Sequence, residues 1–191
     1  MQARLGAKPA RTAATAVVAR QAGSCERTIL GIDPSLRGTG YGVIRASRSR
    51  SVSLAHGTIA CPKNWDRSRC LGRIAGELRA LLVVHRPDLC VVEGLFFAQN
   101  LKTAIIMGEA RGAALAVVAE SGVEIFELAT RKVKLAIVGY GGAQKIAVAK
   151  MVQRLLSLPE LPAPDAADAL ALAVAFAQEQ GRFSLKPPQR I

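Results

Sequence analysis

The sequence has 191 residues, half of them apolar, and its 26 Lys and Arg side chains outnumber 14 Asp and Glu side chains, giving a formal charge of +12. This length suits one domain with a sizeable core, and the charge favours a polyanionic partner, nucleic acid or an anionic membrane, over a basic surface with no partner. The longest uncharged apolar run, 169–177, is about half the roughly 20 residues that cross a bilayer, which excludes a transmembrane helix.

Residues 1–27 differ in composition from the rest of the chain. They are rich in Ala and Arg, and Glu26 is their only acid. Such a composition is typical of a transit-type segment, of a disordered basic arm, or of translation from an upstream start codon. We expect a flexible basic extension without a catalytic role, and all three origins stay open.

The cysteines are scattered along the chain and form no CxxC pair; they are Cys25, Cys61, Cys70 and Cys90. Neither histidine lies within a few residues of a cysteine, so no zinc site is expected. Scattered cysteines of this kind are typical of reduced thiols in a cytosolic compartment. We therefore expect a bacterial cytoplasm, with organellar import left open by the basic extension.

The chain after the extension begins with three predicted strands, 28–33, 40–46 and 51–60, joined by short connections that favour an antiparallel meander. Apolar residues at helical spacing predict a helix over 66–84, which Pro87 ends. Within the run 88–94, residues 89–92 are all apolar, which indicates a strand buried on both faces.

A long helix is expected over 100–120, and its small residues Gly108, Ala110 and Gly112 leave a face that another backbone can approach closely. A strand at 123–128 and helices at 143–157 and 165–180 follow. The pattern predicts one α/β domain over 28–180, with a mixed five-stranded sheet flanked by helices, and a basic tail at 181–191.

Four carboxylates stand where packing does not require them. Asp33 ends the first strand and Glu93 ends the fourth, while Asp165 and Asp168 lie three residues apart, on one face of the last helix. If the long connection crosses over, the first and fourth strands are parallel neighbours, and their acids emerge at one edge of the sheet. Taken singly, each acid has an ordinary explanation, such as an Asp-Pro turn or a complement to the helix dipole.

Clustered carboxylates repel one another unless a cation compensates. Oxygen ligands of this kind suit a hard ion such as Mg²⁺, and two such ions roughly 4 Å apart can activate a water and stabilise the leaving oxygen of a phosphodiester. The sequence thus predicts a nuclease with an acidic, metal-binding centre in a basic surround.

Basic residues flank this predicted centre in two stretches without acids, 34–65 and 128–159. We expect them to neutralise phosphates, and the candidates for DNA contact are Arg37, Arg131, Lys132 and Lys150. A solvated helix face is the alternative explanation for the lysines on helices.

Five segments, "GIDPSLRGTGYGVI", "VVEGLFFAQN", "MGEARGAAL", "VKLAIVGYGGAQK" and "LPAPDAADALALA", follow the order and spacing of the RuvC family of Holliday (crossover) junction endonucleases. The chain resembles that family over about residues 28–178. The resemblance implies a ribonuclease H-like fold and a homodimer that makes paired symmetric nicks in a four-way DNA junction. It also implies two Mg²⁺ ions per subunit, with Mn²⁺ as a substitute, and a branch-migration motor complex as partner.

The same resemblance assigns roles to individual residues. The metal ligands map onto Asp33, Glu93, Asp165 and Asp168. Two catalytic-site lysines map onto Lys134 and Lys145, and an aromatic that stacks on an unpaired base maps onto Phe96, for which core packing is the alternative. Ser35 and Gly94 depart from the family pattern, which usually has glycine and often glutamine at these positions.

Two other classes of protein share part of this pattern. An ATP-using enzyme of the actin and sugar-kinase superfamily has a similar strand and glycine turn for phosphates, but it needs a second phosphate loop and a duplicated domain, for which 191 residues leave no room. A non-catalytic nucleic-acid binder would need the basic surface and not the acids.

Overall fold

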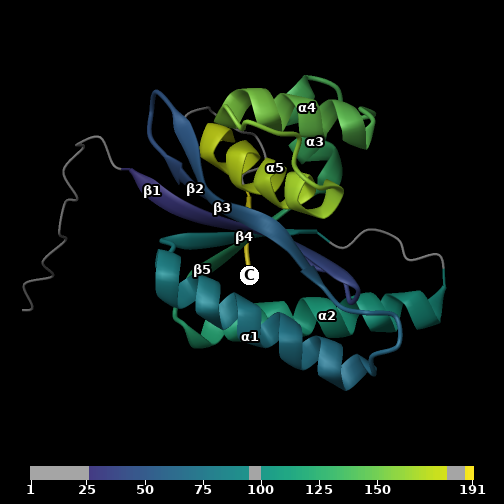
Figure 1. Cartoon of the computed structure of the whole chain (residues 1–191). Helices are drawn as coiled ribbons and strands as arrows, with labels where there is room; N and C mark the ends of the chain where they lie inside the picture. Colours follow the sequence, from purple (N-terminus) through teal and green to yellow (C-terminus); the bar gives the residue numbers. More distant parts are fainter. Residues whose placement is uncertain (1–25, 95–99, 180–187) are drawn as a thin grey trace, which may run out of the picture.

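The computed structural model describes residues 26–94, 100–179 and 188–191 (Figure 1). Its elements in chain order are β1 (Arg27–Asp33), β2 (Gly38–Ala46), β3 (Ser51–Ala60), α1 (Arg67–His85), β4 (Leu89–Glu93), α2 (Leu101–Glu120), β5 (Glu124–Leu128), α3 (Thr130–Val138), α4 (Lys145–Leu156), α5 (Pro164–Glu179) and β6 (Gln189–Arg190). None of the helices in the described ranges is long and apolar enough to cross a bilayer.

One mixed sheet runs through the middle of the molecule, with the strand order β3-β2-β1-β4-β5-β6. The first three strands form the expected antiparallel meander, and β4 pairs parallel to β1 after the crossover through α1. Figure 1 shows α3, α4 and α5 over one face of the sheet and α1 and α2 over the other. Each face has its own apolar core, so the molecule is a three-layer sandwich.

Side-chain alternation sends the ends of the two central strands to the same face. Ile32 in β1 and Val92 in β4 both belong to the core under α1 and α2. Because successive residues of a strand point to opposite faces, the following residues, Asp33 and Glu93, point to the face covered by α5.

Glycines let α5 lie directly on the main chain of β1 and β2. A Cβ atom at Gly31 would lie 2.0 Å from the carbonyl oxygen of Ala169, and one at Gly40 would lie 2.0 Å from that of Asp165. No side chain fits in these gaps. Gly31 in β1 and Gly40 in β2 therefore determine how closely α5 lies over the sheet. This distance in turn determines how far Asp165 and Asp168 stand from it.

The pattern predicts neither α3 nor β6. Helix α3 has only nine residues, of which Val133 and Ile137 are buried, and it ends at Gly139, whose φ is 79°. Its basic side chains obscure this short apolar period. Strand β6, at Gln189–Arg190, pairs with β5 within the segment expected to be a basic tail, so the prediction of five strands is wrong by one.

Candidate active site

Asp33 and Glu93 lie side by side at the ends of β1 and β4. The two strands are parallel, and Ile32 is in register with Val92, one residue before each acid. Glu93 raises the pKa of Asp33 through its charge and through side-chain hydrogen bonding, as expected for two neighbouring carboxyl groups. The crossover expected from the sequence therefore exists, and it brings together two carboxylates that are 60 residues apart.

Helix α5 brings Asp168 to this pair, since the charge of Asp168 acts on Asp33. Asp165, three residues earlier, directs its Oδ2 atom toward Gly38 at the start of β2. No hydrogen bond between Asp165 and the other acids exists within the described part of the chain. Asp33, Glu93 and Asp168 therefore lie near enough to act on one another electrostatically, and Asp165 lies one turn before Asp168 on the same helix, beside Gly38.

The crowding changes the acidity of Asp33. Burial, the charge of Glu93, the hydrogen bond with Glu93 and the charge of Asp168 together raise the pKa of Asp33 from 3.8 to about 8, although Lys145 acts in the opposite direction. A second carboxylate nearby disfavours the charged form of a buried acid. Near neutral pH, Asp33 therefore favours its protonated form unless a cation approaches.

Lys145, the first residue of α4, supplies positive charge at the edge of the site. Its Nζ atom donates a hydrogen bond to Oδ2 of Asp168 at 2.5 Å. This hydrogen bond, followed by the charges of Asp168, Asp33 and Glu93, raises the pKa of Lys145. The lysine side chain is 71% exposed, so its ammonium group can leave Asp168 without disturbing the core.

The raised pKa of Asp33 predicts an effect on stability. The native state binds more protons than the unfolded state between about pH 4 and pH 8, so this group makes the free energy of unfolding fall as pH rises through that interval. Asn cannot ionise. For metal-free protein we expect Asp33→Asn to leave Tm unchanged at pH 4 and to raise it by at least about 2 °C at pH 8, measured by circular dichroism in EDTA.

Glu77→Gln is the matched control for this comparison. Glu77 is a half-exposed partner of Arg73 on α1, at 3.2 Å, on the opposite face of the sheet. Its variant should track the wild-type Tm at each pH. If the Tm of Asp33→Asn differed from that of wild type by the same amount at pH 4 and pH 8, burial and the neighbouring acids would not raise the pKa of Asp33 as described.

The acids do not form a closed metal cage. Among the described residues, no group of three or more His, Cys, Asp or Glu side chains is placed to hold a metal ion as it stands. Two of the acids have other partners, since Thr130 Oγ1 donates to Glu93 Oε1 at 2.5 Å and Lys145 donates to Asp168. The oxygen donors gathered around Asp33 suit a hard divalent cation, provided that the cation displaces the ammonium group of Lys145 and the proton of Asp33.

The other predicted basic residues lie outside this contact network. Lys134 is half-buried on α3, and no hydrogen bond or ion pair between described residues joins it to the acids. Arg131 on α3 and Lys150 on α4 are exposed. Lys132 lies 4.0 Å from Glu179 of α5 in an ion pair. Their roles toward DNA stay predictions.

Arg37 is exposed, and its guanidinium also contacts the protein, so its role toward DNA stays a prediction. Its Nη1 atom donates to the carbonyl oxygens of Pro62 and Trp65, at 2.6 and 3.1 Å, and to Sγ of Cys70 at 3.2 Å. These contacts give Arg37 a structural role in holding the loop after β3. The nearby turn at Ser35 is closed by its main-chain bonds with the Thr39 hydroxyl, at 2.6 and 3.2 Å, so serine is accommodated there.

Phe96 lies outside the described residues. Two residues that the sequence analysis did not single out contact Glu93, namely Thr130 and Arg111. Arg111 could have been noticed as a charged residue on the apolar side of α2, since it adjoins Ala110 and lies one turn before Ala114, which are both buried. Thr130 carried no signal, because its role depends on where β5 ends beside β4.

The fold and the site together define a class: an acidic edge on a mixed α/β sheet, in a chain of formal charge +12, is suited to an enzyme that cleaves phosphodiesters of nucleic acid. The family model "Crossover junction endodeoxyribonuclease RuvC" matches residues 29–176. The chain belongs to this family, the crossover junction endodeoxyribonucleases of the RuvC type, as the resemblance implied.

Individual relatives agree with this assignment. The RuvC of Syntrophomonas wolfei is 44% identical over 147 residues, which are 76% of this chain and 86% of the relative. The RuvC of Rubrobacter xylanophilus is 44% identical over 80% of this chain and 86% of its own length. The solved structure of T. thermophilus RuvC in complex with a Holliday junction substrate has a TM-score of 0.77 and 30% identity, covering 86% of this chain and 99% of that one.

Proposed function

We propose that this protein is a metal-dependent endonuclease that resolves four-way (Holliday) DNA junctions by paired symmetric nicks during recombination and repair. The observation that carries the proposal is the convergence of Asp33, Glu93 and Asp168 from three separate elements in a strongly basic chain of the RuvC family. The solved relative with a junction substrate supports the choice of DNA.

Asp33, Glu93 and Asp168 would hold Mg²⁺, or Mn²⁺ in its place, and Asp165 would join them at the second of two ions. Bound there, the metal supplies an activated water and a Lewis acid for the leaving oxygen of the phosphodiester. The chain's own residues bring the oxygen ligands to one edge of the sheet. Asp33 must release its proton for this, and a cation nearby favours that release.

Lys145 has a second role in this proposal. In the structure its ammonium neutralises Asp168. Released from Asp168, the exposed lysine would be free to offset the negative charge that develops on the phosphate in the transition state. Lys134 is the further candidate for this role, and Arg131, Lys132 and Lys150 would bind phosphates away from the cut.

The enzyme is proposed to act as a homodimer through one face of α2. Positions with spacings of three and four residues share a helix face, and this face is formed by Leu101, Ile105, Gly108, Gly112, Ala116 and Ala119, all exposed. Ala110, which was expected on this face with the two glycines, is instead buried in the core under α1 and α2, so that part of the expectation is wrong. Leu101 and Ile105 are 77% and 49% exposed, and Cβ atoms at both glycines would meet nothing within 4 Å. Such a face suits close contact with a second copy.

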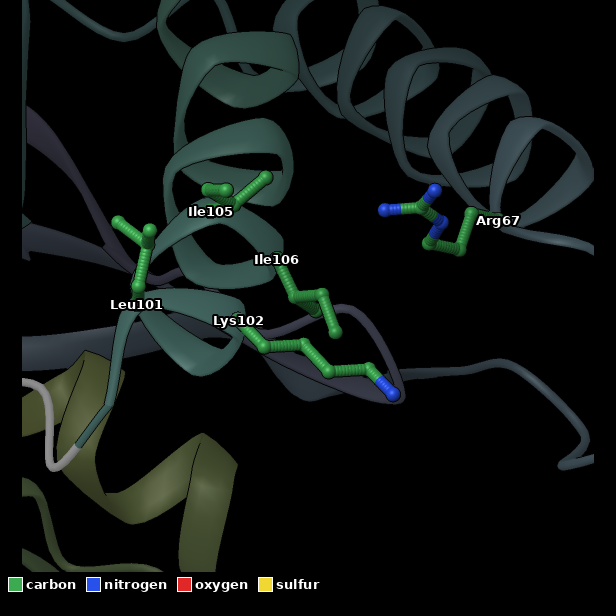
Figure 2. Close-up of a pocket in the computed structure, with 5 residues that line it drawn as sticks. All are labelled: Arg67, Leu101, Lys102, Ile105 and Ile106. Carbon is green, nitrogen blue, oxygen red and sulfur yellow. The ribbon is translucent and has the colours of Figure 1, made fainter.

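Figure 2 shows the start of this face. Leu101 and Ile105 lie one turn apart on α2, while Lys102 and Ile106 extend toward Arg67 of α1, and these five residues line a groove of about 620 Å³. Light scattering should give a mass near twice the 20.1 kDa of the chain. A mass of one chain, unchanged by junction DNA, would contradict the dimer.

The family supports two remaining elements of the proposal, a cytoplasmic location and cooperation with a branch-migration motor complex. The nuclease domain is proposed over 28–180 together with β6, because Gln189–Arg190 adds a strand to its sheet. The basic composition of 1–27 supports an extension without a part in the chemistry.

A synthetic immobile four-way junction tests the function directly. We expect pure protein with Mg²⁺ to nick two opposing strands at symmetric positions and to leave a linear duplex of equal sequence uncut. Uncut junction with both Mg²⁺ and Mn²⁺ would overturn the proposal. Tight junction binding without cleavage would instead favour the non-catalytic binder.

A further inference from the structure

Glu93 has partners on both sides of the sheet edge, at two different parts of the residue. On the α5 side, the hydroxyl of Thr130 donates to its carboxylate at 2.5 Å. On the α2 side, the guanidinium of Arg111 donates to its main-chain carbonyl.

The position of Thr130 follows from the register of β4 and β5. Glu93 is paired with Leu128, the last residue of β5, and the ladder continues with the bond from Gly94 N–H to the carbonyl of Leu128 at 2.8 Å. Thr130 comes two residues later, as the first residue of α3. Its hydroxyl therefore lies just beyond the end of β5, where it can donate to the carboxylate of Glu93 at the end of β4.

Arg111 is fixed from its other side. Its side chain is 8% exposed, and a second guanidinium nitrogen forms an ion pair with Oε2 of Glu127 at 2.5 Å. Ile125 belongs to the core under α1 and α2, so Glu127, two residues on in the same strand, points to that face as well. The planar guanidinium thus joins α2, the end of β4 and β5.

Gly94 makes room for this pair. A Cβ atom at position 94 would lie 3.1 Å from Oε1 of Glu127, tighter than an ordinary contact. The missing side chain, a departure from the family pattern, leaves Glu127 free to reach Arg111. The glycine and the buried ion pair are therefore parts of one local arrangement.

We infer that Thr130 and Arg111 are positioning residues that hold the Glu93 carboxylate in its orientation beside Asp33. The inference rests on the proposed function, since it assigns these residues a part in junction cleavage. A carboxylate at the end of a strand can move in two ways: its side chain can rotate, and its main chain can shift away from the sheet. The bond from Thr130 to the carboxylate restrains the rotation, and the bond from Arg111 to the main-chain carbonyl restrains the shift. Together they favour a single geometry for the reacting atoms.

The threonine is tested with a pair of substitutions. Thr130→Val keeps the shape and removes the hydroxyl, and we expect the single-turnover cleavage rate to fall by about 10-fold or more. Thr130→Ser keeps the hydroxyl and should restore most of the rate. Junction affinity in EDTA should stay within about twofold of wild type for both, because Thr130 contacts Glu93 and not DNA. Cleavage at the wild-type rate by Thr130→Val would overturn its role.

The arginine needs a double substitution, since removing one partner would leave a buried charge unpaired. Arg111→Met with Glu127→Met removes both charges and also the bond to the Glu93 carbonyl. We expect cleavage about 10²-fold slower with unchanged junction affinity. The control is Arg79→Met with Glu120→Met, an exposed ion pair at 3.3 Å between α1 and α2, which should cleave as wild type does.

Amide hydrogen exchange at Gly94 gives a readout that does not require activity. Losing the Arg111 bond should loosen the end of β4 and speed exchange of this amide in the double variant, but not in the control. Unchanged exchange together with wild-type cleavage would overturn the inference, as would a loss of cleavage matched by an equal loss of junction affinity. If wild-type protein does not cleave, the proposed function fails, and the exchange of Gly94 alone decides whether Arg111 positions Glu93.

Discussion

Asp33→Asn is expected to abolish junction cleavage and to leave junction binding intact. Asp33 has the most crowded position among the acids, since it contacts Glu93 and senses the charges of Asp168 and Lys145. Asn keeps the shape of the side chain but loses the charge that holds a cation and the lone pairs of the second oxygen. We expect the single-turnover rate to fall by at least about 10³-fold.

Binding should not fall. Near neutral pH in EDTA the wild-type Asp33 is already mostly protonated, so the neutral Asn should leave the affinity for a labelled junction equal to that of wild type. Above about pH 8, where the wild-type carboxylate is charged and repels phosphate, the variant should bind the junction more tightly. Glu77→Gln makes the same carboxylate-to-amide change on α1 and should alter neither measurement. If Asp33→Asn cleaved at the wild-type rate, the acids would not be the catalytic centre. Loss of both binding and cleavage would point to a structural role.

Gly40→Ala is expected to impair cleavage without changing any charged residue. The added Cβ would lie 2.0 Å from the carbonyl oxygen of Asp165 and 2.5 Å from its carbonyl carbon. These are main-chain atoms of α5, so the helix must shift as a body, and Asp168 moves with it away from Asp33. A displacement of about 1 Å costs roughly 10²-fold in rate.

The same substitution should lower Tm, because added volume in a packed interior costs about 1–3 kcal/mol, or roughly 2–4 °C per kcal/mol for a chain of this size. Gly72→Ala is the matched control, since a Cβ there meets nothing within 4 Å on α1. It should keep full activity and gain slight stability from the better helix former. Equal cleavage rates for the two variants would show that the distance of α5 from the sheet does not determine the geometry of the active site.

The pairing of Asp33 with Glu93 could be predicted from sequence because it depends on simple rules. Two short apolar runs each end in an acid, and a helical connection between them makes the strands parallel, so both acids must reach the same edge. The spacing of Asp165 and Asp168 on one helix was equally predictable. The position of Asp165 beside Gly38 was not, since it depends on how α5 lies over Gly38 and Gly40.

The contacts of Arg37, Arg111 and Thr130 could not be predicted either. A basic residue near an acidic centre suggests a phosphate contact by its charge alone. Whether its guanidinium instead donates to a loop carbonyl or to a strand end depends on distances across the fold. Helix α3 was missed for a related reason, because two buried residues in nine are too few to establish a period.

The alternation of the central strands has a consequence for changes in chain length. An extra codon in the loop between β3 and α1 lengthens a connection and leaves the strand register untouched. One inserted residue within β4 reverses the face of everything after it, which would turn the Glu93 side chain away from Asp33 and toward the side of Arg111. The five-residue count of this strand is therefore as much a determinant of the site as the carboxylate that ends it.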